Sequence, residues 1–458
     1  MIENDAFKLL LINLFHLNPN DITNIVCTTF NKMMVLLVTL ADKHQACPYC
    51  GFTAPKIKEY VTKEITHSAL TTQKCIIKYR ARRYKCPCCG KTYYEFNPFV
   101  FKSQKISILT VHNILKDLKD FNETFTSVAR RYHVSPTSVS TIFDNHVDIG
   151  RNPLPEIINF DEVYAFKSEK SKYVCVLLDF KKQIPVDVLP NRKKEYLLNY
   201  FQKIPLEERK KVKYACSDMY EVYRDVVHKV FPCSCMLLDY FHLSQDFHRK
   251  MNEVRIKVMK GYKDDKASDE YYLLKKFNWL LFKNPEDEDK YGRLFDVERE
   301  RKYNSHFKSY MNYYDLRRKL LEINNNLTIC YSLKLELVDF YSKSTIDNAQ
   351  VNLEHLIRSC IDTNIEEMIA FSNNLINWKQ EIINSFTIVG TEYKVEADKG
   401  QVVVCNKKVN NAIIENRNKI IKCIKNNANG YTNWSRFRNR VMYVLDPNTT
   451  FSLEPREK

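Results

Sequence analysis

The stretch Ile157-Ile-Asn-Phe-Asp161 ends an apolar run on an acidic residue, and Val212-Lys-Tyr-Ala-Cys-Ser-Asp218 repeats that arrangement further along the chain. Short apolar runs rich in β-branched and aromatic residues predict buried strands. Each aspartate is therefore expected in a strand or just beyond its end. Because Mg²⁺ prefers oxygen ligands from a few carboxylates, Asp161 and Asp218 are candidates for a metal-dependent site that acts on phosphate.

The segments around these aspartates predict a sheet of mixed direction. Three strand-like segments follow one another closely, as in an antiparallel meander, and helix-like and strand-like segments then alternate. This order is typical of a ribonuclease-H-like fold, in which the first and fourth strands are central neighbours and would bring Asp161 and Asp218 together. The expected strands are 157–166, 173–180, 184–189, 212–218 and 233–238, and the expected helices are 193–201 and 220–230.

A third carboxylate, Glu415, lies in a lysine-rich segment with helical periodicity. At about 100° per residue, Glu415 shares a face with Asn418, Lys419 and Lys422. We expect Glu415 to complete the carboxylate site and Lys419 and Lys422 to lie beside a phosphate backbone. An ordinary surface helix with a Glu415–Lys419 pair is the alternative. The opposite face is apolar and can pack on the sheet; it consists of Ile413, Ile420, Ile421 and Ile424.

Residues 241 to about 394 separate Glu415 from the two aspartates and differ in composition. They are rich in Lys, Asn, Glu and Leu and show little of the alternation that marks strands. We expect an all-helical insertion that interrupts the catalytic domain.

Two cysteine motifs precede the predicted catalytic domain: Cys47-Pro-Tyr-Cys50-Gly51 and Cys86-Pro-Cys-Cys89-Gly90. Two CxxC pairs can supply four thiolates to one tetrahedral Zn²⁺ ion, which leaves no open position and favours a structural role. A glycine after each pair permits the positive φ of a tight metal-holding turn. With strand-like sequence between the pairs, the pattern is that of a zinc ribbon. The expected ligands are Cys47, Cys50, Cys86 and Cys89, and Cys88 is a spare thiol.

The segment after the cysteine motifs predicts a helix-turn-helix. Apolar residues recur at helical spacing over 107–118, a short segment with the small Ala129 follows, and Ser135-Pro136 supplies a good N-cap and first residue for another helix. In this motif the second helix enters the major groove of DNA, so we expect residues 1–150 to bind DNA as a fragment. Base contacts are expected from Thr137, Ser138 and Thr141, and phosphate contacts from Arg130 and Arg131.

The charge of the chain agrees with a nucleic-acid partner. The 458 residues carry a net charge of +16, and such an excess suits a polyanion. No apolar run approaches the roughly 18–20 residues that span a bilayer, and the acidic N-terminus is unlike a secretory signal. We therefore expect no membrane association and a cytoplasmic protein whose 15 cysteines are mostly reduced.

Over nearly its whole length the sequence resembles the ISL-three (ISL3) family of bacterial insertion-sequence transposases. Beside the two cysteine motifs, several segments match in the family's order, and an ordered set is more specific than any single motif. These segments are Asn159-Phe-Asp161-Glu, Val188-Leu-Pro-Asn-Arg192, Ser217-Asp218-Met-Tyr, Leu238-Asp239-Tyr-Phe-His242, Trp279-Leu-Leu-Phe-Lys-Asn-Pro285, Leu333-Lys-Leu-Glu336, Asn411-Ala-Ile-Ile-Glu415-Asn-Arg-Asn418-Lys-Ile-Ile-Lys422 and Asn429-Gly430-Tyr431.

The resemblance implies a DDE transposase in which Asp161, Asp218 and Glu415 are catalytic and bind two Mg²⁺ or Mn²⁺ ions. Such an enzyme would bind the inverted-repeat ends of its element as double-stranded DNA. It would cut a phosphodiester to expose a 3′-hydroxyl and join that hydroxyl to target DNA. It would act as a homo-oligomer on DNA. The competing interpretation is a catalytically silent DNA-binding protein, either a regulator or a decayed transposase copy.

Other polar residues near these motifs compete for a place in the site. Glu162 is expected on the opposite face of its strand, Asp179 at the end of the second strand, and Asp239 in an accessory position. His242 could orient Asp239, contact DNA or be a structural histidine. The competing carboxylates are Glu162, Asp179 and Asp239.

The expected architecture is a multidomain α+β protein. It comprises a zinc-binding domain at 1–98, a helix-turn-helix domain at 99–150, the first part of a ribonuclease-H-like catalytic domain at 151–240, an all-helical insertion at 241–395, the closing catalytic helix with the glutamate at 396–447, and a tail at 448–458.

Overall fold

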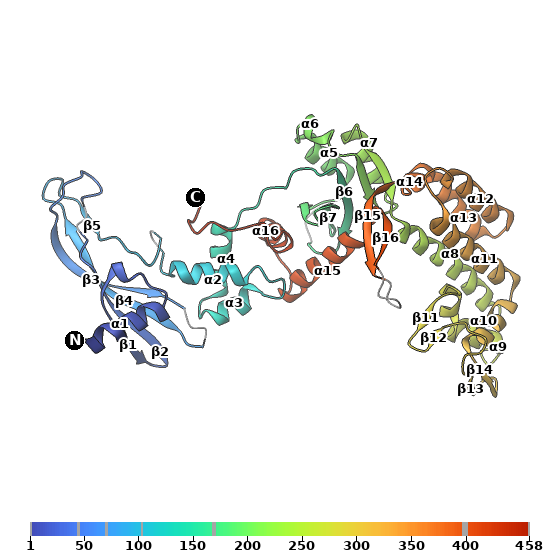
Figure 1. Cartoon of the computed structure of the whole chain (residues 1–458), viewed down its shortest axis with the longest axis horizontal. Coiled ribbons are helices and arrows are strands. Elements are labelled where there is room, and N and C mark those ends of the chain that lie inside the picture. The colour runs from blue at the N-terminus through green and yellow to red at the C-terminus, as the bar shows by residue number, and fades with distance from the viewer. Residues whose placement is uncertain are drawn as a thin grey trace.

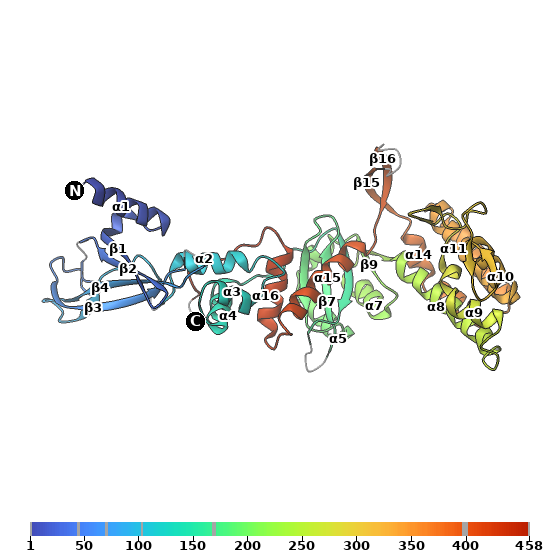
Figure 2. The same cartoon turned by 90° about the horizontal axis from the view of Figure 1, so that it is seen from below.

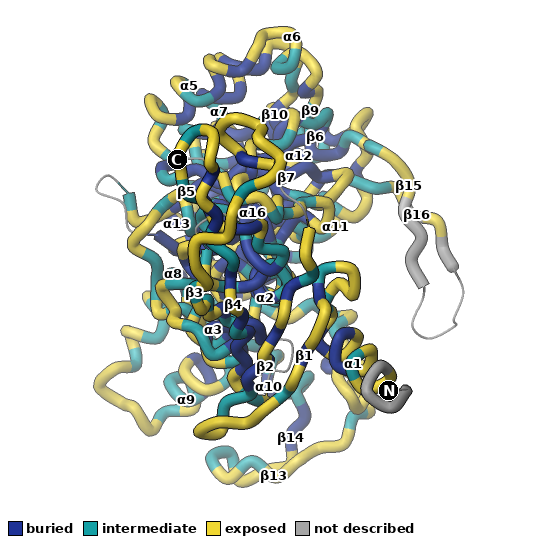
Figure 3. The backbone as a smooth tube through the Cα atoms, turned by 90° about the vertical axis from the view of Figure 1, so that its left-hand side faces the viewer, coloured by how far each residue is buried: buried dark blue, intermediate teal, exposed yellow. Residues whose placement is uncertain are grey.

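The computed structural model describes residues 2–43, 46–68, 72–101, 104–166, 171–395 and 402–456. The molecule is an elongated α+β protein of several parts, as predicted: an N-terminal sheet, a set of short helices, a central mixed sheet and a second helical part follow one another (Figure 1). Seen from the N-terminal end, buried stretches are concentrated toward the middle of the view, and exposed stretches lie around the edge and also cross the front (Figure 3). In the described part of the chain, no helix has both the length and the apolar character that crossing a bilayer requires.

The N-terminal part is a five-stranded sheet with helix α1 (Ile2–Leu14) beside it (Figure 2). Its strand order is β1-β2-β4-β3, with β5 paired to β4, and β2–β4 is parallel while the other pairs are antiparallel. Leu11, Ile12 and Phe15 pack on the apolar side of the sheet. The strands are β1 (Ile22–Phe30), β2 (Met33–Leu40), β3 (Lys56–Thr66), β4 (Cys75–Lys85) and β5 (Thr92–Tyr94), and the 3-10 helix η1 (Pro19–Asp21) precedes β1.

Three short helices follow: α2 (Ile108–Asp117), α3 (Phe125–Arg131) and α4 (Pro136–His146). Each begins at a hydroxyl N-cap whose side chain accepts a hydrogen bond from a backbone N–H of the first turn. The capped helix predicted from the Ser135-Pro136 dipeptide is therefore present. Between α3 and α4 the chain turns through His133, which adopts a positive φ of 54°. The N-caps are Ser107, Thr124 and Ser135.

These three helices share one hydrophobic core with the C-terminal helices α15 (Ala412–Asn427) and α16 (Trp434–Leu445). The rings of Phe143 and Tyr443 lie 6.0 Å apart in an edge contact. The buried guanidinium of Arg440 donates to the backbone carbonyls of Asp120 and Glu123 at 2.9 and 2.7 Å. The helical segment after the cysteine motifs is thus packed directly against the end of the chain. Shared core residues include Val111, Ile114, Val128, Val139, Phe437, Val441 and Leu445.

The central sheet has the strand order β10-β9-β6-β7-β8. β6, β7 and β8 form an antiparallel meander, and β9 and β10 run parallel to β6. One face carries α5 (Lys194–Gln202) and α7 (Glu221–Val230), and the other carries α15 and α16. All five predicted strands are present. They are β6 (Ile157–Val163), β7 (Val174–Asp179), β8 (Pro185–Leu189), β9 (Tyr214–Ser217) and β10 (Cys235–Leu238); the short α6 (Leu206–Arg209) precedes β9.

The insertion after β10 is mainly helical, but the prediction that it is all-helical was wrong. It contains two short hairpins, β11 (Glu288–Asp289) with β12 (Gly292–Arg293) and β13 (Lys302–Asn304) with β14 (Ser309–Met311). Both depend on a residue with positive φ, Gly292 at 96° and Lys308 at 50°, which a composition-based reading does not reveal. The helices are α8 (Tyr240–Lys260), α9 (Asp269–Lys276), η2 (Asn278–Phe282), α10 (Tyr313–Glu322), α11 (Asn325–Lys343), α12 (Ala349–Asp362), α13 (Glu366–Asn377) and α14 (Lys379–Asn384).

A longer hairpin, β15 (Ile388–Val395) with β16 (Val402–Lys408), leads from the insertion back to α15. It projects from the body of the molecule (Figure 2). Its strands are rich in β-branched residues, as expected for an antiparallel pair. The sequence suggested that the insertion ends at 395, and β15 ends at Val395, so the expected boundary falls between the two strands of this hairpin.

Candidate active site

Three aspartates lie in one row across the parallel strands of the central sheet. Asn159 of β6 is paired with Cys216 of the parallel strand β9. Asp161 and Asp218 each lie two residues after these partners, so they lie side by side across the two strands. Ser217 is opposite Leu238 of β10, which places Asp239 beside Asp218 in the same way. The sheet therefore brings together Asp161 and Asp218, as predicted from the two apolar runs, and adds Asp239.

The side chain of Asp161 is fixed from two sides. Its Oδ1 accepts a hydrogen bond from the backbone N–H of Glu162 at 2.7 Å, and its Oδ2 accepts one from Asn418 Nδ2 of α15 at 2.8 Å. Burial raises the pKa of Asp161 to about 7, and the neighbouring carboxylate of Asp218 adds to the shift. The carboxylate form is thus costly here unless positive charge is supplied.

Burial also disfavours the charged forms of Asp218 and Asp239. Burial raises the pKa of Asp218 to about 6, and the carboxylate of Glu162 adds to the shift. Burial also raises the pKa of Asp239. Accumulating carboxylates in this way is typical of sites that hold divalent cations.

A second group of side chains adjoins the row of aspartates. The ligand atoms of Asp239, His242 and Glu415 all lie within 4.8 Å of one another. His242, in the first turn of α8, has its Nε2 3.9 Å from Asp239 Oδ2 and 3.9 Å from Glu415 Oε1. A pocket of about 530 Å³ opens beside Asp239 and Glu415. The pocket therefore adjoins this group at Asp239 and Glu415.

The start of α15, and with it Glu415, is anchored to the strand that carries Asp161. Asn411 Nδ2 donates to the carbonyl of Phe160 at 3.3 Å, and Asn411 Oδ1 accepts from Asn159 Nδ2 at 2.7 Å. The buried side of α15 includes Asn418 together with Ile414, Ile421 and Ile424. The apolar residues predicted to pack on the sheet do so: Ile421 and Ile424 are buried, and Ile413 and Ile420 are partly buried against the same core. The prediction that Asn418 lies on the opposite face with Glu415 was wrong, because Asn418 is buried and its amide bonds to Asp161.

Several polar atoms of this region are buried without a partner. Asp218 Oδ1, Asp239 Oδ2 and His242 Nε2 have no hydrogen-bond partner among the described residues. Leaving such atoms unsatisfied costs roughly 1–3 kcal/mol each, and more for a charged group. Two carboxylate oxygens and an imidazole nitrogen are ligands that divalent metals accept. The residues present therefore fit a divalent cation.

The competing carboxylates Glu162 and Asp179 have other partners. Asp179 Oδ1 accepts from the backbone N–H groups of Lys181 and Lys182 at 2.9 and 3.0 Å, which closes the turn between β7 and β8. Glu162 pairs with Arg192 and lies 3.4 Å from the hydroxyl of Tyr223. Because Tyr223 belongs to α7, Glu162 faces the side of the sheet opposite α15.

The residues expected to contact DNA are spread over α3, α4 and α15. Thr137, Thr141, Lys419 and Lys422 are exposed, and so is Arg130. Ser138 is half-buried, and its hydroxyl lies 2.8 Å from that of the N-cap Ser135. Arg131 forms ion pairs with both Asp117 and Glu123, which the sequence did not predict.

The four predicted zinc-binding cysteines converge. Their sulfur atoms all lie within 4.8 Å of one another, with Cys47 and Cys89 3.7 Å apart and Cys50 and Cys86 3.5 Å apart. Tetrahedral zinc with bonds of about 2.3 Å requires sulfur separations of about 3.8 Å. Gly51 and Gly90 adopt positive φ values of 75° and 71°, as expected for the turns that close each pair. This cluster could hold Zn²⁺, and the exposed Cys88 is not part of it.

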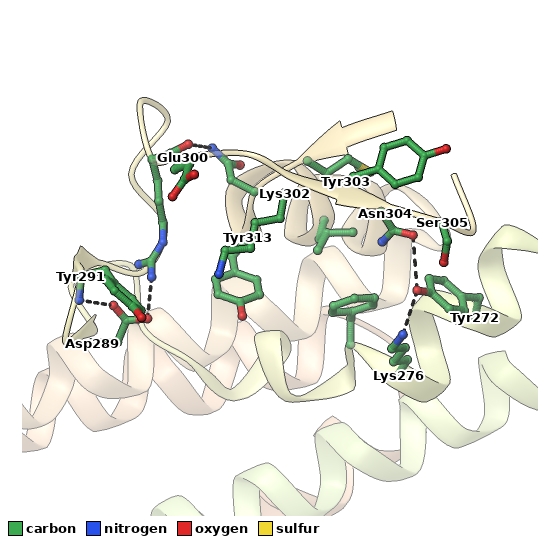
Figure 4. A pocket seen from close by; sticks show the side chains of 15 residues that line it. Tyr272, Lys276, Asp289, Tyr291, Glu300, Lys302, Tyr303, Asn304, Ser305 and Tyr313 are labelled. Atoms are coloured by element: carbon green, nitrogen blue, oxygen red, sulfur yellow. Dashed lines mark hydrogen bonds and ion pairs between the residues drawn. The ribbon is translucent and has the colours of Figure 1, made fainter. Parts of the chain in front are cut away.

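A separate pocket of about 290 Å³ lies in the insertion (Figure 4). Tyrosines line it, and two of its cations are engaged: Arg299 pairs with Asp289 at 2.6 Å, and Lys276 Nζ donates to the hydroxyl of Tyr272 at 3.1 Å. No residue of the carboxylate row lines this pocket. It is therefore distinct from the candidate active site.

Sequence reasoning missed part of the site. It left the roles of Asp239 and His242 open and did not predict the contacts of Asn411 and Asn418. The available signal for Asp239 was its position directly after a strand that parallels the one ending at Asp218. The asparagine contacts join α15 to β6 across the insertion, and periodicity within one helix cannot show such contacts.

Comparison with known proteins identifies the family. The ISL3 family of DDE transposases, described as "Transposase", matches residues 158–397, which is more than half of the chain. That range includes Asp161, Asp218, Asp239 and His242 and ends before Glu415. The chain is also similar to the transposase for insertion sequence element IS1001 of Bordetella parapertussis, with 20% identity over 409 residues that cover 89% of this chain and 90% of that protein. The chain belongs to the ISL3 family of DDE transposases.

Proposed function

We propose that this chain binds the inverted-repeat ends of an insertion sequence and catalyses metal-dependent phosphodiester cleavage and strand transfer. The observation that supports this most is the convergence of carboxylates from distant elements: Asp161 on β6, Asp218 after β9, Asp239 after β10 and Glu415 at the start of α15. Family membership supports the same chemistry.

We infer that the central sheet is the core of a ribonuclease-H-like catalytic domain. The order β10-β9-β6-β7-β8, with an antiparallel meander and two added parallel strands, is the arrangement expected for that fold. The helical insertion separates β10 from α15, and α15 then returns to pack on the sheet. A long interruption is compatible with the fold because both of its ends meet at the same edge of the site.

Asp161, Asp218 and Glu415 are the proposed catalytic residues and would hold two divalent cations, Mg²⁺ or Mn²⁺. When bound, these cations would supply the Lewis acidity that activates an attacking oxygen and stabilises a leaving oxygen. Asn418 holds Asp161 in orientation through their 2.8 Å hydrogen bond. The unpartnered Oδ1 of Asp218 is available as a ligand.

We assign Asp239 and His242 to the Glu415 side of the site as positioning residues. Their atoms lie within 4.8 Å of one another and of Glu415. The imidazole Nε2 lies 3.9 Å from an oxygen of each carboxylate and so stands between them. A carboxylate on a helix can thereby be held against one at a strand end.

The proposed DNA contacts lie on α4, α3 and α15. Thr137, Ser138 and Thr141 would read base edges from α4. Arg130 would contact phosphate, whereas the ion pairs of Arg131 with Asp117 and Glu123 favour a role in holding α2 and α3 together. Joining two ends to one target requires two active sites, so we propose that a homo-oligomer acts on DNA. The residues that would lie along the DNA beside Glu415 are Lys419 and Lys422.

We further propose that Cys47, Cys50, Cys86 and Cys89 bind one structural Zn²⁺ ion. Four thiolate ligands fill a tetrahedral site and leave no position for a substrate. The cluster lies at the end of β4, and binding there would hold the β4–β5 hairpin to the segment that precedes β3.

One experiment separates transposase from the silent DNA-binding alternative. The full-length protein is incubated with Mg²⁺ and a DNA that carries the inverted repeats bracketing its own gene. A transposase cuts at the repeat boundary and leaves a 3′-hydroxyl, which is detected by end-labelling. Binding to the repeats without any cut, with Mg²⁺ or with Mn²⁺, would identify the protein as the silent alternative.

A further inference from the structure

A pocket of about 370 Å³ lies between α3 and the turn that joins α15 to α16, and we call it the junction pocket. One wall is formed by residues 124–127 and Arg130, and the other by residues 427–433 and Arg436. The two walls are about 300 residues apart in the chain and are brought together by the core that α3 and α4 share with α16. The pocket is therefore a product of the tertiary fold and does not belong to either segment alone.

The lining of the junction pocket is polar and contains no carboxylate. Thr126, Asn429 and Thr432 contribute exposed side chains that make no hydrogen bond to the described residues. Arg130 also lines the pocket, is exposed, and has no ion pair in the described part of the chain. Hydroxyl, amide and guanidinium groups are the side chains that contact DNA phosphates.

The acidic side chains that contact the lining residues Ser127 and Arg436 are already paired. Glu123 pairs with Arg131, and Asp144 pairs with Arg436 at 2.6 Å. Arg130 is thus an unbalanced positive charge at the pocket. An anion would meet attraction there without opposing carboxylate charge.

The walls of the pocket are held firmly. Asn429 and Gly430 end α15 with positive φ values of 54° and 99°, and the N–H of Gly430 donates to the carbonyl of Lys425 at 2.9 Å. Tyr431 then packs edge-on against Phe125 of the other wall, with ring centroids 6.3 Å apart. Because both walls are preorganised, little ordering is needed when a ligand binds.

We propose that the junction pocket binds one backbone phosphate of the DNA duplex that α4 contacts. The inference rests on the proposed function and adds a contact from the C-terminal part of the chain. In helix-turn-helix proteins the first helix of the pair crosses the DNA backbone, and α3 is that helix here. The same turn ends α15, which carries Glu415, so a phosphate bound by both walls ties the DNA-reading helices to the helix of the active site.

The test measures binding of the full-length protein to a fluorescent DNA duplex of about 30 base pairs over a range of salt concentrations. The variants are Arg130→Gln, which removes the unbalanced charge, and Thr432→Asp, which adds a negative charge to the opposite wall. Ser435→Asp is the matched control. Ser435 is exposed, lies three residues after Thr432 and does not line the pocket. Thr432→Val is a milder variant that removes only the hydroxyl.

We expect Arg130→Gln and Thr432→Asp each to weaken binding about tenfold, and Arg130→Gln to reduce the slope of log K against log salt by about 0.9, the value for one lost phosphate contact. The double variant should weaken binding by less than the product of the single effects, because both walls act on one phosphate. Ser435→Asp should stay within about twofold of wild type.

Two outcomes would overturn the inference in different ways. If the wild type binds DNA but Thr432→Asp and Thr432→Val behave like Ser435→Asp, the pocket is not a phosphate site and the proposed function is unaffected. If the wild type binds neither this duplex nor one carrying the inverted repeats, DNA binding itself is wrong, and the proposed function fails together with the inference.

Discussion

Asn418 Nδ2 donates a 2.8 Å hydrogen bond to Asp161 Oδ2 across a sequence separation of 257 residues. The bond connects the helix that carries Glu415 to the central strand of the sheet. The helical insertion lies between these two residues in the sequence. The bond shows that the insertion does not keep the carboxylates apart in space. Asn418 is therefore the clearest single link between the two parts of the proposed catalytic domain.

Replacing Asn418 with leucine should reduce DNA cleavage about tenfold or more, because Asp161 loses the group that orients it. Leucine has a similar size, so the melting temperature should change by only a few degrees. Asn426→Ala, on the exposed side of the same helix, is the matched control and should cleave as wild type. Cleavage by Asn418→Leu at the wild-type rate would show that this hydrogen bond does not position Asp161.

The contribution of Asp161 to the stability of the metal-free protein should fall as the pH rises from about 4 to about 7. An aspartate in an unfolded chain titrates near about 3.9, whereas burial raises the pKa of Asp161 to about 7 in the folded protein. Between these values Asp161 holds a proton in the folded protein that it has lost in the unfolded chain, so its contribution to the free energy of unfolding falls with rising pH.

Asp161→Asn removes that titration. At pH 8 without Mg²⁺, the variant should be more stable than wild type by about 1–4 kcal/mol, and the difference should vanish near pH 4. Thermal melting at a series of pH values measures this, in buffers without chelator so that zinc is retained. If the variant is less stable than wild type at pH 8, the charged carboxylate of Asp161 does not destabilise the folded protein.

The four-cysteine cluster should bind one Zn²⁺ ion per chain, which metal analysis of the purified protein measures. Cys89→Ser should lose the metal and lower the melting temperature, because metal binding and folding are coupled. Cys88→Ser is the neighbouring control; Cys88 is exposed and lies outside the cluster, so its variant should keep the zinc. Equal loss of zinc in both variants would contradict the ligand assignment.

A fragment of residues 1–150 should fold poorly, although the sequence suggested that it binds DNA by itself. The helices α2 to α4 bury Val139 and Phe143 against Val441 and Tyr443 of α16, and the fragment exposes this surface. Co-expression with residues 409–456 should restore a soluble complex that binds DNA. A stable 1–150 fragment that binds DNA as tightly as the full-length protein would show that α16 is dispensable for these helices.

The central sheet could be predicted because its signals are local. The run that ends at Asp161 and the run that ends at Asp218 each mark a buried strand, and the order of such runs indicates which strands are neighbours. The N-cap of α4 at Ser135 is a local signal of the same kind.

Contacts between distant segments could not be predicted in this way. Asp239 and His242 meet Glu415 because α15 returns to the end of β10, and nothing in the sequence near either segment shows that return. The pairing of Arg131 with Asp117 and Glu123 likewise depends on how α2 and α3 pack. The short hairpins of the insertion were missed because strands of two or three residues carry no measurable alternation.

The most direct test of the central claim is cleavage of the inverted-repeat DNA by single carboxylate variants. Asp161→Asn, Asp218→Asn and Glu415→Gln keep the size of each side chain and remove its charge. Asp179→Asn is the matched control, since Asp179 ends a strand of the same sheet but caps the β7–β8 turn. We predict that Mg²⁺-dependent cleavage falls at least about a hundredfold in each of the three variants. Their affinity for the repeats should stay within about twofold of wild type. Asp179→Asn should cleave at the wild-type rate. Near-wild-type cleavage by any one of the three would contradict its assignment to the active site.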